Sequence, residues 1–203
     1  MNQSSQPPTA DRIKQAAVTM FTESGYEGTS MSEIAKEVGI KTPSIYAHFK
    51  SKEQLFLQLL EEGIADERSQ FIMLSEATKQ EQVWERLYKV FDFFTDYERL
   101  TAGQAFLKRT MLVPPRHLRD HLSQQIISLE AEMDHYLKDM IHQGQNDGSI
   151  VLRDAEEMIA LLYNGVDGLL VEYQIYNDSL FNKRKQMVWR SFMRTWTTTD
   201  GKD

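Results

Sequence analysis

The sequence contains no cysteine in its 203 residues, which excludes disulfides, thiolate metal sites and cysteine nucleophiles. Only 5 prolines and 10 glycines are present, and no clear alternation of apolar and polar residues is visible, so helices are expected rather than strands. No apolar run approaches the ~18 residues of a membrane span. Residues 1–8 are polar and do not resemble a signal peptide. We therefore expect a soluble cytoplasmic protein with no membrane partner.

Basic residues are fewer than acidic ones, with 23 lysines and arginines against 30 aspartates and glutamates, so the formal net charge is −7. This imbalance is uneven along the chain. Residues 1–52 contain six basic and five acidic side chains and carry +1, so the remainder carries −8. The excess acid can therefore lie away from a nucleic-acid partner, although a nearly neutral N-terminal segment gives only weak electrostatic steering.

Residues 29–53 carry the most specific pattern in the chain. Ser30 and Glu33 have the spacing of a capping box, which predicts a helix beginning at Met31. Gly39 can adopt the left-handed conformation that ends this helix. Thr42 is expected to cap a second helix, with Pro43 at its first position.

The second helix is expected to run from Pro43 to Phe49. At about 100° per residue, Ile45 and Phe49 share the side that faces the core. Pro43, Ser44 and Ala47 lie opposite, with Tyr46 and His48 at the two edges. A helix pair of this kind can place a short polar face in the major groove of DNA. A small helical subdomain with a solvated polar face is the alternative.

A third helix is expected after Ser51, because Ser51 and Gln54 repeat the capping-box spacing. With this third helix, the segment from about Asp11 to Leu60 closely resembles the DNA-binding domain of TetR-family (TetR/AcrR-like) transcriptional regulators. The motifs that carry the resemblance are Ala16-Ala17 with Phe21, Gly25-Tyr26, Thr29-Ser30, Ile34-Ala35, Gly39-Ile40, Ile45-Tyr46, His48-Phe49 and Ser51-Lys52-Glu53 with Leu55. Pro43 stands where many members carry glycine.

The resemblance implies a homodimer bound to a double-stranded DNA operator, and the two-fold axis implies that the operator is a palindrome. Donors at the edges of the groove-bound helix are placed for phosphates, and the exposed face for base edges. The candidate DNA contacts are Ser30, Met31, Ser32, Lys41, Thr42, Pro43, Ser44, Tyr46, Ala47, His48 and Lys52.

The chain is expected to be all-α, with a helix-turn-helix domain at 1–52, ordered from about residue 10, and a ligand-binding and dimerisation domain at 53–203. Apolar periodicity predicts further helices near 11–24, from Ser51 onward, at 82–97, around Phe106, from Leu118 to a turn at 144–148, at 154–176 and at 183–197. Asp154 can cap the helix that follows it.

The C-terminal part is rich in aromatic and methionine side chains, which can line a pocket for an apolar or aromatic effector. An ordinary core is the alternative for each of them. The pocket candidates are Trp84, Tyr88, Phe91, Phe106, Met111, Met133, Tyr136, Met140, Tyr163, Asn164 and Asp167.

The last two expected helices carry apolar residues on more than one face, so part of that surface requires a second chain. The resemblance implies a four-helix interface between two subunits. The interface candidates are Leu169, Tyr173, Val188, Phe192 and Trp196.

Catalytic and metal chemistry find little support. His117 and His121 have a metal-compatible i, i+4 spacing, but they lie in a charged run without an evident third ligand. There is no phosphate-binding glycine loop and no arrangement that suggests a triad. We expect a ligand-responsive repressor without cofactor or metal. The alternative is a helical enzyme or ligand-binding protein whose helix-turn-helix-like subdomain is not regulatory.

Overall fold

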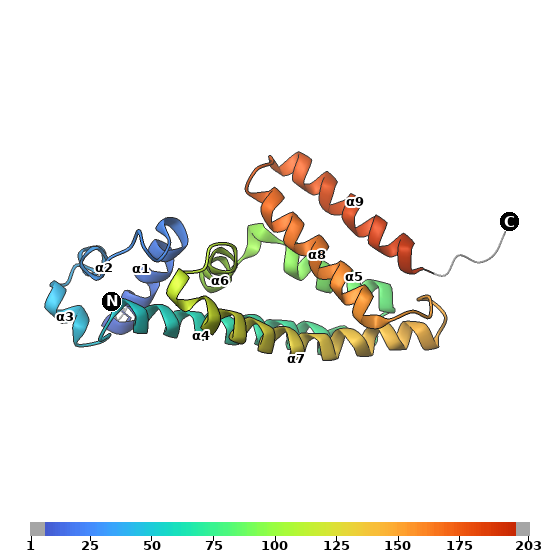
Figure 1. Cartoon of the computed structure of the whole chain (residues 1–203), viewed down its shortest axis with the longest axis horizontal. Helices are drawn as coiled ribbons and strands as arrows, with labels where there is room; N and C mark the ends of the chain where they lie inside the picture. The colour runs from blue at the N-terminus through green and yellow to red at the C-terminus, as the bar shows by residue number, and fades with distance from the viewer. Residues whose placement is uncertain (1–6, 198–203) are drawn as a thin grey trace, which may run out of the picture. The chain divides into compact units, whose positions relative to one another are not determined.

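The computed structural model describes residues 7–197. Within this range every regular element is a helix, apart from an isolated bridge between Ile150 and Thr197, so the all-α prediction is confirmed. None of these helices combines the length and apolarity needed to cross a bilayer. The helices in Figure 1 are α1 (Thr9–Ser24), α2 (Met31–Val38), α3 (Thr42–Tyr46), α4 (Lys52–Ala77), α5 (Val83–Thr95), η1 (Tyr97–Arg99), α6 (Ala102–Leu112), η2 (Arg116–Leu118), α7 (Arg119–Asn146), α8 (Ala155–Tyr173) and α9 (Asp178–Trp196).

The chain forms two compact units. The N-terminal unit comprises Met1–Glu67 and Leu100–Ile127, and the C-terminal unit comprises Arg68–Arg99 and Ser128–Asp203. The N-terminal unit thus extends beyond residue 52, because α6 packs against α1 and draws residues 100–127 into it. The functional division at residues 52 and 53 stays a prediction.

An aromatic cluster holds the N-terminal unit together. The ring of Phe56 on α4 lies edge-on to Phe21 of α1 at 5.2 Å and to Phe106 of α6 at 5.1 Å between centroids. All three side chains are buried. Each contributes about 1.5–3 kcal/mol by leaving water, so α6 is firmly attached to α1 and α4.

In the C-terminal unit, α5 packs against both α8 and α9, and α8 packs against α9. Figure 1 shows α8 and α9 side by side and antiparallel. The side chains of Phe91, Leu162 and Trp196 are among those that fill this core. Much of the apolar surface predicted for α8 and α9 is therefore buried within the subunit itself.

Several helix ends differ from the predictions. Gly144 and Asn146 lie within α7, and the turn begins only at Asp147, whose carboxylate accepts from the Ser149 amide at 2.9 Å. The last helix begins at Asp178 rather than at 183, because Asn177 caps it by accepting from the Leu180 amide at 3.0 Å. The predicted cap at Asp154 is confirmed, and its carboxylate accepts from Glu156.

Candidate nucleic-acid interface

Helix α2 begins and ends as its local sequence predicts. The Ser30 hydroxyl accepts from the Glu33 amide at 3.2 Å, and the Glu33 carboxylate accepts from the Ser30 amide at 2.9 Å, so the capping box is complete. Hydrogen bonds from the Ser30 hydroxyl and amide lower the pKa of Glu33. Gly39 ends the helix with a φ of 76°, a left-handed conformation that favours glycine.

Loss of this cap is expected to destabilise α2. Replacing Ser30 by alanine removes the acceptor for the Glu33 amide and should cost about 1 kcal/mol of unfolding free energy. Urea denaturation followed by far-UV circular dichroism measures the loss. The Ser44→Ala variant is the control, because Ser44 is exposed and lies outside the box. Equal stability of wild type and Ser30→Ala would contradict a stabilising role for the cap.

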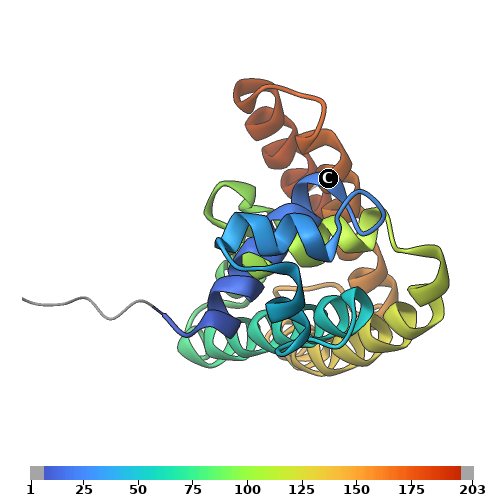
Figure 2. The same cartoon turned by 90° about the vertical axis from the view of Figure 1, so that its left-hand side faces the viewer.

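Helix α3 starts one residue earlier and ends sooner than predicted. Thr42 is its first residue and not its cap, since Lys41 occupies the cap position and no side chain bonds there. Pro43 accordingly lies at the second position. The helix ends at Tyr46, and the next residues turn so that Ser51 can cap α4 by accepting from the Gln54 amide at 3.0 Å. Figures 1 and 2 show α3 beside α2.

The faces of the α3 segment are sorted as predicted. Ile45 and Phe49 are buried against the unit's core. The opposite surface is exposed and polar or small in character, and Tyr46 is half exposed at its edge. The exposed DNA-contact candidates are Ser32, Lys41, Thr42, Pro43, Ser44, Tyr46, Ala47 and His48.

Met31 needs correction as a DNA contact. Its side chain is buried in the core of the unit, so only its backbone remains available to a partner. The Ser30 side chain is engaged in the capping box and lies 3.0 Å from the Ser32 hydroxyl. Helical spacing alone did not separate the buried from the exposed positions at this helix start.

Lys52 has a structural role that the sequence did not indicate. Its ammonium donates to the carbonyl oxygens of Tyr26 at 2.7 Å and Thr29 at 3.0 Å, and it lies 4.1 Å from the centre of the Tyr26 ring. These contacts fix the loop before α2 to the start of α4. The contact between Lys52 and a DNA phosphate stays a prediction. The phosphate would have to share the Lys52 ammonium with the two carbonyl oxygens.

The Tyr26 ring contacts side chains from several segments of this unit. Burial raises the pKa of its hydroxyl, with Glu53 and Glu27 adding to the effect. The His117 ring lies 5.0 Å from the Tyr26 ring between centroids, and His117 Nε2 is 3.6 Å from the Glu53 carboxylate.

Over residues 7–197 no group of three or more histidine, aspartate or glutamate side chains is arranged to hold a metal ion.

The predicted effector residues are divided between the two units. Phe106 and Met111 belong to the N-terminal unit, and Phe106 is part of its aromatic core. The other candidates lie in the C-terminal unit, where Phe91, Met133 and Met140 are buried. Asn164 and Asp167 are exposed on α8.

Tyr163 is tied to the acidic side chains of α7. Its hydroxyl donates to the Asp134 carboxylate at 3.1 Å, and burial raises its pKa, with Asp134 adding to the effect. Burial also raises the pKa of Glu130, again with a contribution from Asp134. These groups form a polar patch among the aromatic residues of the unit.

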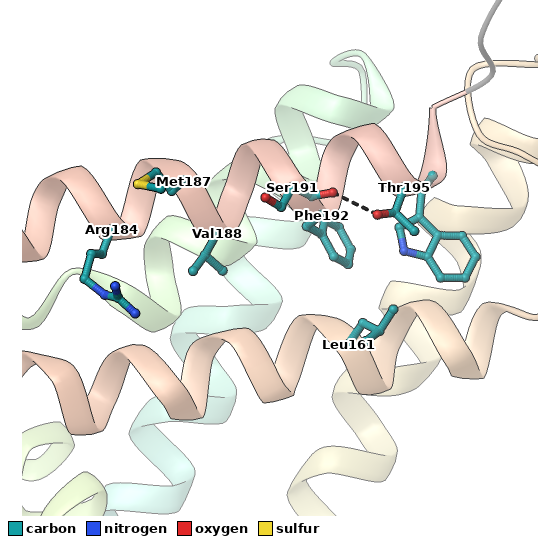
Figure 3. A pocket seen from close by; sticks show the side chains of 8 residues that line it. Leu161, Arg184, Met187, Val188, Ser191, Phe192 and Thr195 are labelled. Atoms are coloured by element: carbon teal, nitrogen blue, oxygen red, sulfur yellow. Dashed lines mark hydrogen bonds between the residues drawn. The ribbon is translucent and has the colours of Figure 1, made fainter.

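Leu169 needs correction as an interface residue, because it is only 1% exposed within a single subunit and has almost no surface left for a partner. Trp196 is 2% exposed, but it borders a groove of about 380 Å³ between α8 and α9, as do Val188 and Phe192. Figure 3 shows Leu161 of α8 pointing toward α9 near Phe192, while Val188 of α9 points toward α8. The sequence signal that could have found this face is the i, i+4, i+7 spacing of Leu161, Gly165 and Gly168.

The N-terminal part of the chain matches a family of known proteins. The family described as bacterial regulatory proteins, tetR family, matches residues 13–59. The biofilm operon icaADBC HTH-type negative transcriptional regulator IcaR of Staphylococcus aureus (strain Newman) is 37% identical over 89 residues, which cover 43% of this chain and 47% of IcaR. The match therefore spans about half the length of this relative.

Solved structures share the fold over almost the whole chain. A protein of Saccharomonospora viridis in complex with choline has a TM-score of 0.77 at 18% identity, covering 94% of this chain and 98% of that one. AibR in complex with isovaleryl coenzyme A and operator DNA has a TM-score of 0.68 at 17% identity, covering 93% and 97%. Residues 13–59 thus match the tetR family of bacterial regulatory proteins, whose matched relative IcaR is a transcriptional regulator and not an enzyme, and the chain as a whole shares its fold with these solved structures.

Proposed function

We propose that the protein is a ligand-responsive transcriptional repressor that binds a palindromic DNA operator in the cytoplasm as a homodimer. The observation that carries the proposal is the capped α2–turn–α3 segment, whose second helix buries Ile45 and exposes Ser44 and its neighbours. Such a helix gains little from packing its outer face, and a major groove gives that face a partner.

The roles within this segment follow from position. Pro43, Ser44 and Ala47 lie on the exposed face and read base edges. Lys41 and Tyr46 lie beside them and contact phosphates. The segment 1–52 carries only +1 formal charge, so specific contacts and dimerisation supply most of the affinity.

Repression and its release are supported by the comparisons. IcaR is a negative transcriptional regulator, and AibR was solved with both an acyl coenzyme A and operator DNA. In this chain a small apolar or aromatic effector binds the C-terminal unit and shifts the spacing of the two DNA-binding heads. By linkage, an effector that weakens DNA binding is itself bound more weakly in the presence of DNA.

Dimerisation is supported by an apolar surface that the subunit leaves uncovered. Leu161 is 50% exposed and Met187 is 49% exposed, and both border the groove between α8 and α9. A side chain at Gly165 would meet Val188 at 3.0 Å, so Gly165 lets α9 approach α8. A side chain at Gly168 would meet nothing within 4 Å, so the backbone there is open to a partner. We assign this surface to a second copy, related by a two-fold axis.

Selection of genomic fragments by the purified protein tests the proposal. A regulator should enrich an inverted repeat with two half-sites spaced by about one helical turn, ~34 Å. Enrichment of no symmetric sequence, with or without candidate effectors, would favour the alternative of a helical ligand-binding protein.

The two kinds of DNA contact are expected to respond differently to substitution. Lys41→Ala should weaken binding to operator and scrambled duplexes alike and lower the salt slope by about 1, because a phosphate contact is lost. Ser44→Ala should alter sequence preference without that change in slope. Titrations at two salt concentrations measure both, with Lys183→Ala on the exposed surface of α9 as the control. An unchanged salt slope for Lys41→Ala would remove Lys41 from the interface.

A further inference from the structure

A second groove lies on the C-terminal unit between α5 and α9. Its volume is about 480 Å³, within the range of small-molecule sites. Trp189 lines it together with Tyr88 and Phe91. The Trp189 ring lies 5.2 Å from Tyr88 and 5.3 Å from Phe91 between centroids. This groove shares no lining residue with the one between α8 and α9.

The aromatic residues that line the groove differ in how far they are exposed to solvent. Phe91 is buried beneath the groove, Trp189 is partly exposed and Tyr88 is 44% exposed. A subunit that needed these rings only for its core would bury them more fully. As they lie, they present an apolar surface on which a flat ring system can stack.

The charges in the groove favour an anion. The Lys185 ammonium lies 2.7 Å from the Asp92 carboxylate, so the acid in the groove is already neutralised. Arg190 donates from Nε to the Gln186 carbonyl at 3.3 Å, and in the described part of the chain no carboxylate lies within ion-pair distance of it. The groove thus carries a net positive charge in a chain of net charge −7.

We propose that this groove binds a planar aromatic carboxylate or a similar aromatic anion. The ring stacks against Trp189 and Tyr88, and the carboxylate pairs with the Arg190 guanidinium, which can bind it through two parallel hydrogen bonds. Asn182 and Gln186, which also line the groove, donate amide hydrogens to further oxygen atoms of the ligand. The site goes beyond the proposed DNA-binding function and is tested without DNA.

Calorimetric titration of the full chain with 2-naphthoate tests the site. At about −0.3 kcal/mol per heavy atom, a molecule of this size should bind with a dissociation constant at or below about 1 mM. The neutral isostere 2-naphthalenemethanol should bind at least about tenfold more weakly, because it cannot pair with the guanidinium. Arg190→Gln should weaken naphthoate binding by a similar factor, and Arg190→Lys should restore part of it.

Arg194→Gln is the matched control, since Arg194 is exposed on the same helix but does not line the groove. It should bind naphthoate as the wild type does. Three results would overturn the proposal: no saturable binding by the wild type, equal binding by Arg190→Gln, or tighter binding of 2-naphthylmethylammonium than of naphthoate. Because Arg190 is exposed, its variants should keep their far-UV circular dichroism spectrum, which separates lost binding from lost folding.

Discussion

Replacing Met187 by aspartate is expected to convert the protein into a folded monomer and to lower operator affinity by about a hundredfold or more. Met187 is 49% exposed in the subunit and borders the groove that we assign to a second copy. A carboxylate there is solvated in the monomer, but it would be buried without a partner in the dimer. A monomer holds only one DNA-binding head, so the gain from binding two half-sites together is lost.

Two variants make this test specific. Leu169→Asp places the charge in the subunit's own core, where burial costs several kcal/mol, and it should unfold the subunit. Leu152→Asp changes a leucine that is almost fully exposed and lies outside the groove, and it should leave the dimer intact. Sedimentation gives the mass and circular dichroism gives the helix content. A wild type that sediments as a single subunit, or a dimeric Met187→Asp variant, would exclude this interface.

Removing the Lys108 ammonium is expected to cost about 3 kcal/mol of unfolding free energy. In the N-terminal unit, the Glu67 carboxylate is only 5% exposed and has charged and neutral partners. Lys108 Nζ lies 3.6 Å from one of its oxygens, and the Gln104 amide donates to the other at 2.8 Å. In Lys108→Met the carboxylate loses this positive charge and remains buried.

Urea denaturation of three variants measures this effect. The double variant Glu67→Gln with Lys108→Met removes both charges and should recover much of the loss, because no buried ion remains. Lys14→Met breaks the exposed pair with Glu62 and should change stability by less than about 1 kcal/mol. If Lys108→Met were as stable as wild type, or if the double variant were less stable than the single one, the pair would not be a buried ionic contact of this kind.

Local sequence determined the elements that depend on neighbouring residues. The capping box of Ser30 and Glu33, the left-handed Gly39 and the cap at Asp154 were all predictable, because each rests on hydrogen bonds or backbone conformations within a few residues. The buried face of the α3 segment, with Ile45 and Phe49, followed from helical spacing for the same reason. The resemblance of residues 11–60 to the family rests on the same local features.

Only the tertiary structure decided which of several apolar faces is internal. Leu169 and Met187 both lie on amphipathic helices, yet one is buried by its own subunit and the other is half exposed, since packing partners come from distant segments. Lys52 bonds to carbonyls 23 and 26 residues earlier, and Glu67 meets a lysine far along the chain. The groove at Trp189 likewise requires α5 and α9 to meet, and no local pattern encodes that contact.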